Sequence, residues 1–322
     1  MCSTSNYDIQ QACYPFAIIS DKQWFDSLLK MSYKRILVHL QQQPGATPVL
    51  AKFTDCILSS LQPDHQHSMQ VSVELKEDRL ILSPPATNST PALLTHPPFC
   101  PAFCLAPSQS KALPDETSKR GVDVGVVVLL ETADTCLLLT RRAAHMRTFP
   151  GTWVPPGGHV ESGEGLLEAG LRELGEETGL VLPPSTIANS RVLALLESFY
   201  PYSLSVGPPK RHHIVTYYYV RTSEHSSALQ ARMKLDETEV DAAMWLSPSL
   251  ATLAATGQMP DNCPNRVELT LLGSQGGQVR GSLPSEVLAR DAPVCGKDVE
   301  RVSSGTRYVL QQWLLAREQN NL

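Results

Sequence analysis

The stretch 158–180 constrains this chain most, because its pattern predicts a single helix with an unusual distribution of charge. Leu167, Leu171 and Leu174 recur at the i, i+4, i+7 spacing of one apolar stripe on an amphipathic helix. The stretch contains no proline. Gly179 stands where a left-handed C-terminal cap would end the helix.

Three glutamates gather on another face of this helix. Glu173, Glu176 and Glu177 fall at i, i+3 and i+4, which places their Cβ atoms roughly 5–6 Å apart. Like charges at this spacing cost a helix about 0.2–0.5 kcal/mol per pair, and the helix dipole also disfavours anions in the last turns. A hard divalent cation would relieve the repulsion, and Mg²⁺ paired with a substrate phosphate is the usual case. A solvated acidic face explains the cluster equally well.

The spacing around the cluster separates these two interpretations. Gly158 is followed after five residues by Glu164 and, after seven more, by the run 172–180, Arg-Glu-Leu-Gly-Glu-Glu-Thr-Gly-Leu. This pattern resembles the Nudix box, with no departures from it. The resemblance implies a Nudix pyrophosphohydrolase, which cleaves a nucleoside diphosphate linked to another group and depends on Mg²⁺ or Mn²⁺.

The resemblance also assigns the metal ligands. Glu173 and Glu177 match the family's metal-binding positions, and the carboxylate of Glu176 and the carbonyl of Gly158 often join them. Metal ions held there would bridge phosphate oxygens and position or ionise the attacking water. A separate structural role is implied for Glu164, which falls off the acid face of an ideal helical wheel.

Arg172 directly precedes the acids, and by resemblance it orients the ligand carboxylates. Helical spacing also allows it to pair with Glu168 one turn back. The general base stays open, because in this family it is a box glutamate or an acid from a distant loop. The box candidates are Glu176 and Glu177, and the loop candidates are Glu239, Glu237 and Asp236. For any one of the loop acids, capping or solvating a turn is the commoner role.

Substrate contacts are expected further along the chain. Lys210 and Arg211 could meet phosphates. Strand alternation sends one of the next two residues, His212 and His213, inward, where a histidine is more often a core residue than a catalyst. A methylated guanine is a cation that stacks on aromatic faces. The aromatic candidates for that contact are Trp153, Phe199, Tyr200 and Tyr202.

Composition excludes several classes of function. The net charge of −5 shows no broad electrostatic footprint for nucleic acid, so we expect no DNA binding, although a nucleotide or a capped RNA end could bind locally. No apolar run approaches a membrane span, and no secretory leader is visible. The eight cysteines are scattered, which favours free thiols and a cytoplasmic location, with the nucleus as a second compartment. Cys100 and Cys104 lie close together, but no second Cys/His pair completes a zinc site. The sequence names no protein partner.

The order of expected strands and helices fits an α/β class. The family resemblance sharpens this to an α/β/α sandwich around a mixed sheet, with a small β-rich N-terminal module and a C-terminal helix. The expected division is an N-terminal extension (1–30), a small module (31–83), a Pro/Ser-rich linker (84–118), the Nudix domain (119–254) and a C-terminal region (255–322). Two interpretations of the extension stay open: a dispensable segment upstream of an alternative start at Met31, or an ordinary ordered N-terminus.

Further runs outside the box resemble an mRNA-decapping branch of the family. They include residues 120–123, 153–161, 209–215 and 301–306. This resemblance implies hydrolysis of the N7-methylguanosine cap of mRNA, with release of N7-methyl-GDP. Two alternatives stay open: a hydrolase of a small dinucleotide or coenzyme such as NADH, ADP-ribose or an acyl-CoA, and a non-enzymatic nucleotide sensor. The intact set of acids argues against the sensor.

Overall fold

The computed structural model divides the chain into two units, Met1–Lys34 and Arg35–Leu322, and all described residues belong to the second. The expected extension 1–30, Cys104 and Tyr202 lie outside the described residues. The description covers residues 35–63, 67–85, 90–96, 100, 113–146, 148–188, 190–201, 207–273, 277–290 and 301–319.

The first part of the described chain is rich in strands. β3 (Ser68–Lys76) and β4 (Arg79–Ser83) pair antiparallel and form a hairpin, as the alternating pattern on either side of residues 76–78 predicts. At the turn, Glu77 and Asp78 have φ values of 50° and 58°, the conformation that tight hairpin turns require. The other elements of this part are β1 (Leu37–Leu40), β2 (Val49–Leu50), α2 (Ile57–Leu61), β5 (Ala92–Thr95) and α5 (Asp115–Ser118).

The central strand β6 (Asp123–Glu131) has a hydrophobic core on each of its faces. Val128 and Leu130 pack with residues of α6 (Leu166–Thr178) and α8 (Ser226–Arg232), whereas the intervening Leu129 packs with residues of α9 (Pro248–Thr256) and α10 (Ser304–Glu318). Successive side chains of a strand point to opposite faces, so a continuous β-branched and leucine run buries both.

The remaining elements complete the sheet and its connections. Gly257, with φ 74°, ends α9, and Ser303 caps α10 by accepting a hydrogen bond from Thr306 N. The elements are β7 (Leu137–Arg142), β8 (Thr152–Val154), β9 (Gly157–His159), α7 (Pro184–Ile187), β10 (Arg191–Tyr200), β11 (Arg211–Arg221), β12 (Val240–Leu246), β13 (Arg266–Leu272), β14 (Gln278–Pro284), η1 (Ser285–Ala289) and β15 (Arg301–Val302).

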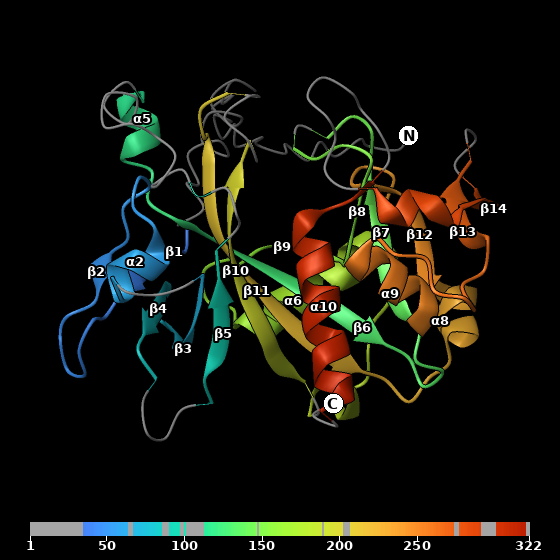
Figure 1. Ribbon diagram of the computed structural model, residues 1–322, viewed down its shortest axis with the longest axis horizontal. Coiled ribbons are helices and arrows are strands. Elements are labelled where there is room, and N and C mark those ends of the chain that lie inside the picture. Colours follow the sequence, from blue (N-terminus) through green and yellow to red (C-terminus); the bar gives the residue numbers. More distant parts are fainter. Residues whose placement is uncertain are drawn as a thin grey trace, which may run out of the picture. The chain divides into compact units, whose positions relative to one another are not determined.

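All described strands join one mixed sheet of 15 strands. Its main path runs β14-β13-β12-β7-β6-β11-β10-β5-β3-β4-β1-β2, with β8, β9 and β15 attached beside it. The β6–β11 pair is parallel and the β10–β11 pair is antiparallel. Helix α6 lies behind the strands and α9 and α10 lie in front (Figure 1). The α/β/α arrangement around a mixed sheet is confirmed.

The strands before residue 119 share this sheet and a core with those after it. β5 lies inside the range 84–118 and pairs with β3 on one side and β10 on the other. One buried cluster contains Leu80 and Leu94 together with Leu195 and Ile214 from the later strands. The division into module, linker and hydrolase domain stays a prediction, but the described strands on both sides of the expected linker bury apolar surface against each other.

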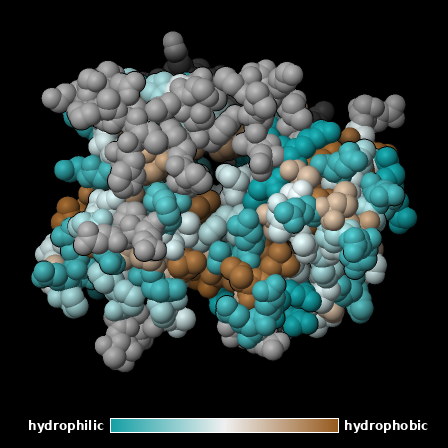
Figure 2. All heavy atoms as spheres, in the orientation of Figure 1, coloured by the Kyte–Doolittle hydropathy of each residue, from teal (hydrophilic) through white to brown (hydrophobic). Residues whose placement is uncertain are grey.

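The face drawn in Figure 2 mixes hydrophilic and hydrophobic residues, and its largest hydrophobic area lies between β5 and the lower half of α10. Leu315 on α10 is 49% exposed. Among the described residues, no helix combines the length and the apolar character that a membrane crossing needs.

Candidate active site

Helix α6 turns two of its acids toward the sheet. The predicted leucine stripe packs against the core, with Leu174 buried and Leu167 and Leu171 half-buried. The acids are buried as well, because Glu173 and Glu177 are only 9% and 3% exposed. The helix packs closely on β6 at Gly170, where a Cβ would come within 2.7 Å of a valine side chain. This contact fixes the rotation of the helix and carries the two acids to the buried side.

Glu177 is held by β7 and by the first residue of β9. Thr140 Oγ1 donates a hydrogen bond to its Oε2 at 2.9 Å, and the backbone N–H of Gly157 donates to Oε1 at 3.2 Å. Burial nevertheless raises the pKa of Glu177 to about 8, because a carboxylate loses its hydration there. A cation at this position would favour the ionised form and offset that cost.

Glu173 lies directly against the backbone of β9. A Cβ placed on Gly158 would come 2.2 Å from Glu173 Oε1, so only glycine allows the carboxylate and the strand to approach this closely. Burial raises the pKa of Glu173, and the neighbouring Arg172 guanidinium opposes that shift. The backbone of Gly158 and the carboxylate of Glu173 therefore share one small space, as the resemblance implies for two metal ligands.

Arg172 links the acids, but not in the way that helical spacing suggested. It forms ion pairs with Glu164 at 2.8 Å, Glu173 at 3.1 Å and Glu176 at 2.9 Å. The expected pairing with Glu168 is wrong, because that carboxylate turns back to accept a hydrogen bond from the N–H of Gly165 at 2.8 Å and caps the helix.

Glu164 and Glu176 have different surroundings. Glu164 precedes the helix rather than lying on it, and its Oε1 accepts the N–H of Glu161 at 2.7 Å, which fits a structural role. The side chain of Glu176 is 56% exposed and forms an ion pair with Arg172. Glu176 is thus the most accessible of the three box acids.

The loop before β12 brings a fourth acid to the site. Asp236 N donates to the carbonyl of Glu177 at 3.0 Å, and Ala143 N donates to the carbonyl of Glu239 at 2.9 Å, so the loop is fixed between α6 and the end of β7. As a result, carboxylate oxygens of Glu173, Glu177 and Glu239 lie within 4.8 Å of one another. Asp236 instead accepts hydrogen bonds from the backbone and side chain of Thr238, a turn-forming role.

Sequence reasoning missed two residues of this site, Thr140 and Arg142. Burial lowers the pKa of Arg142, and the negative charges of Glu177, Glu239 and Glu173 oppose that shift. Thr140 and Arg142 are two positions apart on β7 and so share one face of the strand. Polar residues at alternate positions at the end of an otherwise apolar strand were the available signal.

The residues expected to bind substrate lie where β10 ends and β11 begins. Tyr200 lies opposite Arg211 in the strand register, and Lys210 N donates to the carbonyl of Tyr200 at 2.7 Å. The ring of Tyr200 lies 4.8 Å from that of Phe149. The same loop carries Thr148, whose carbonyl accepts from Arg142 Nε at 3.0 Å. The loop that carries Thr148 and Phe149 therefore contacts both Arg142 and Tyr200. The role of Lys210, Arg211 and Tyr200 in substrate binding stays a prediction.

Two aromatic candidates for base stacking are wrong. Trp153 is 0% exposed in the core beneath α10, and Phe199 is 4% exposed and stacks on His212. Both alternate inward on their strands, which residue type alone does not reveal. His212 is itself fully buried, in agreement with its interpretation as a core histidine.

The residues present fit a hard divalent cation. Three carboxylates converge on one small space, beside a backbone approach that a Cβ would fill. Oxygen ligands of this kind suit Mg²⁺ and Mn²⁺ rather than softer metals. The arrangement can hold a phosphate-bound cation while leaving an exposed carboxylate, that of Glu239, beside it.

We expect Gly158→Ala to weaken metal binding and turnover by at least about tenfold, because the added Cβ displaces the Glu173 carboxylate. Gly175→Ala is the matched control: its Cβ would come no closer than 3.8 Å to another group, and alanine stabilises a helix interior by about 0.5–1 kcal/mol. Calorimetric titration with Mn²⁺ measures both variants. Equal metal affinity for Gly158→Ala and Gly175→Ala would contradict the role of the close approach.

Known proteins resemble this chain over most of its length. Residues 119–262 match the family model of the NUDIX domain. The chain is 43% identical to the m7GpppN-mRNA hydrolase NUDT17 of Danio rerio, over 88% of this chain and 97% of the relative. It is 40% identical to the Xenopus laevis protein of that name (88% and 96%) and 41% identical to the Homo sapiens protein (76% and 77%). This chain belongs to the Nudix hydrolase family.

Proposed function

We propose that this Nudix hydrolase removes the N7-methylguanosine cap of mRNA and releases N7-methyl-GDP. The gathering of Glu173, Glu177 and Glu239 within 4.8 Å supports phosphoanhydride hydrolysis at this site. The cap as substrate is supported by relatives named m7GpppN-mRNA hydrolase, which the chain matches at 40–43% identity over 96–97% of the length of two of them. The proposed substrate is a nucleotide or capped RNA end, met in the cytoplasm, with the nucleus as a second location.

We assign the divalent cation, Mg²⁺ or Mn²⁺, to Glu173, Glu177 and the carbonyl of Gly158, with Glu176 completing the set from its more exposed position. When bound, the cation supplies positive charge that stabilises the charge developing on the transferred phosphoryl group. Arg172 keeps the carboxylates oriented through its ion pairs with Glu173 and Glu176. Arg142 contributes a second, fixed positive charge beside the same acids.

Glu239 is the general base in this proposal. Its side chain is exposed, and its carboxylate lies close to those of Glu173 and Glu177. The Glu177 carboxylate, by contrast, is already engaged in a hydrogen bond with Thr140. It would take a proton from the attacking water as the phosphoanhydride bond breaks. Lys210 and Arg211 would neutralise the remaining phosphates, and Tyr200 would stack on the methylated base.

The alternative substrates are small dinucleotides and coenzymes, which need the same acids but no cap contact. A panel of capped RNA, free cap analogue, NADH, ADP-ribose and an acyl-CoA, each with Mg²⁺ and with Mn²⁺, separates them. We expect N7-methyl-GDP from capped RNA at a higher kcat/KM than any other substrate, and no product in EDTA. Preferential hydrolysis of a coenzyme, with capped RNA left intact, would overturn the cap as substrate.

We expect Glu239→Gln to lower turnover by about 10²–10⁴-fold, the usual contribution of a general base, while Mn²⁺ affinity stays near that of the wild type. Glu237→Gln is the matched control, because Glu237 lies in the same loop and is exposed in the same way. Single-turnover hydrolysis and calorimetric titration measure the two effects separately. Wild-type turnover in Glu239→Gln would place the base among the box glutamates instead.

A further inference from the structure

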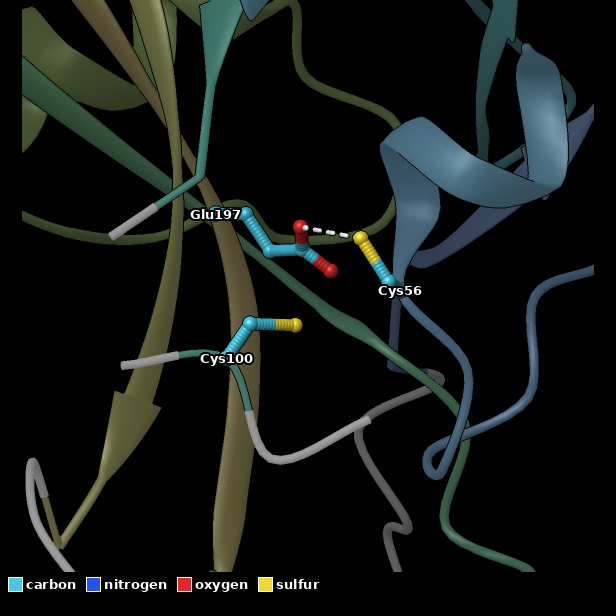
Figure 3. A group of neighbouring side chains, drawn as sticks. All are labelled: Cys56, Cys100 and Glu197. Carbon is cyan, nitrogen blue, oxygen red and sulfur yellow. Dashed lines mark hydrogen bonds between the residues drawn. The ribbon is translucent and has the colours of Figure 1, made fainter. Parts of the chain in front are cut away.

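A second group of potential metal ligands shares no residue with the acid site. Cys56 directly precedes α2, Cys100 follows β5, and Glu197 lies on β10. Their side chains point toward one another (Figure 3), and ligand atoms of all three lie within 4.8 Å of one another. The residues are 3%, 1% and 0% exposed, respectively. Two thiols and a carboxyl group therefore share one buried pocket.

The spacing of these atoms suits a tetrahedral zinc ion. Cys56 Sγ lies 3.6 Å from Glu197 Oε2. Zinc binds thiolate sulfur at about 2.3 Å and carboxylate oxygen at about 2.0–2.2 Å in tetrahedral geometry, which puts a sulfur and an oxygen on the same ion about 3.6 Å apart. The two atoms already stand at the separation that a shared ion requires.

Other groups hold the Glu197 carboxylate in place from its far side. Ile57 N donates to Oε1 at 2.8 Å, and His212 Nε2 lies 2.9 Å from the same oxygen. His212 Nδ1 lies 2.9 Å from the carbonyl of Phe53, which can only accept a hydrogen bond. Oε2 is thereby directed at Cys56. A hydrogen bond from the outside that orients a ligating carboxylate is the common pattern around protein metal ions.

Zinc would not add net charge to this pocket. With the Glu197 carboxylate ionised throughout, binding releases the two thiol protons of Cys56 and Cys100 as one divalent ion enters, so the total charge of the three ligands and the ion stays the same. An uncompensated buried charge would be costly. The two thiols supply soft sulfur ligands and Glu197 a hard oxygen, a mixture that suits zinc rather than Mg²⁺.

We propose that Cys56, Cys100 and Glu197 bind one zinc ion, with a water molecule in the fourth position and His212 positioning the carboxylate. The ion would join α2 and the segment after β5 to strand β10, three parts that are distant in sequence. Its role is structural, since it would fasten α2 and the segment after β5 to the strand β10. Local cysteine spacing cannot reveal it, because Cys56 and Glu197 are 141 positions apart.

The test uses the full chain, purified under reducing conditions with excess Mg²⁺ to saturate the acid site. Zinc content is measured by mass spectrometry, and Co²⁺ is substituted so that thiolate ligation gives a charge-transfer absorption band. Cys56→Ser and Cys100→Ser are compared with Cys136→Ser and Cys263→Ser, which change half-buried free cysteines outside the pocket. Glu177→Gln serves as a control for metal held at the acid site.

We expect one zinc per chain in the wild type and in the three controls. Cys56→Ser and Cys100→Ser should weaken zinc binding by at least about 10–100-fold and lower the melting temperature toward that of the zinc-stripped wild type. If circular dichroism shows that either variant is misfolded, the cobalt spectrum of the wild type provides the test instead. A thiolate charge-transfer band in that spectrum supports the site. Absence of that band, wild-type zinc affinity in the serine variants, or a Cys56–Cys100 disulfide in freshly reduced protein would overturn it.

Discussion

Glu177 is 3% exposed and lies between β7 and β9, where its carboxylate accepts hydrogen bonds from Thr140 and Gly157. Two neutral donors do not offset the loss of hydration, and the pKa of the group rises to about 8. The surrounding structure holds this carboxylate in place despite the free-energy cost of its burial. Close packing at Gly170 sets the rotation of α6, and Gly158 of β9 lets the backbone approach Glu173.

Local patterns were sufficient to predict much of the fold. Gly179 and Gly257 end their helices in the left-handed conformation, because a helix stop of this kind depends on a few adjacent residues. The hairpin at residues 76–79 and the C-terminal helix could be predicted for the same reason, because each depends on residues that are close together in the sequence. At the site, the spacing of the box predicted that Glu173 and Glu177 stand together, and the structure brings Glu239 to them.

Contacts between distant segments could not be predicted in the same way. The pattern of α6 predicted the leucine stripe but not the burial of Glu173 and Glu177, because the decisive contact, Gly170 against β6, joins two elements. Thr140 and Arg142 reach the acids from β7, and the partner of Cys56 is 141 positions away on β10. Trp153 has the residue type of a base-stacking contact, but strand alternation buries it completely. In each case tertiary packing, rather than residue type, decides the outcome.

The central claim is that the fold holds Glu177 at a cost that a divalent cation removes, and thermal unfolding of Glu177→Gln tests it. The folded-state pKa of about 8 exceeds the unfolded value of about 4.3, so without metal the wild type loses stability as pH rises across that window. Glutamine cannot ionise. In EDTA the variant should therefore melt above the wild type, by more at pH 8 than at pH 5, and Mn²⁺ should stabilise the wild type far more than the variant. A variant that melts below the wild type at both pH values, with equal stabilisation by Mn²⁺, would contradict the account.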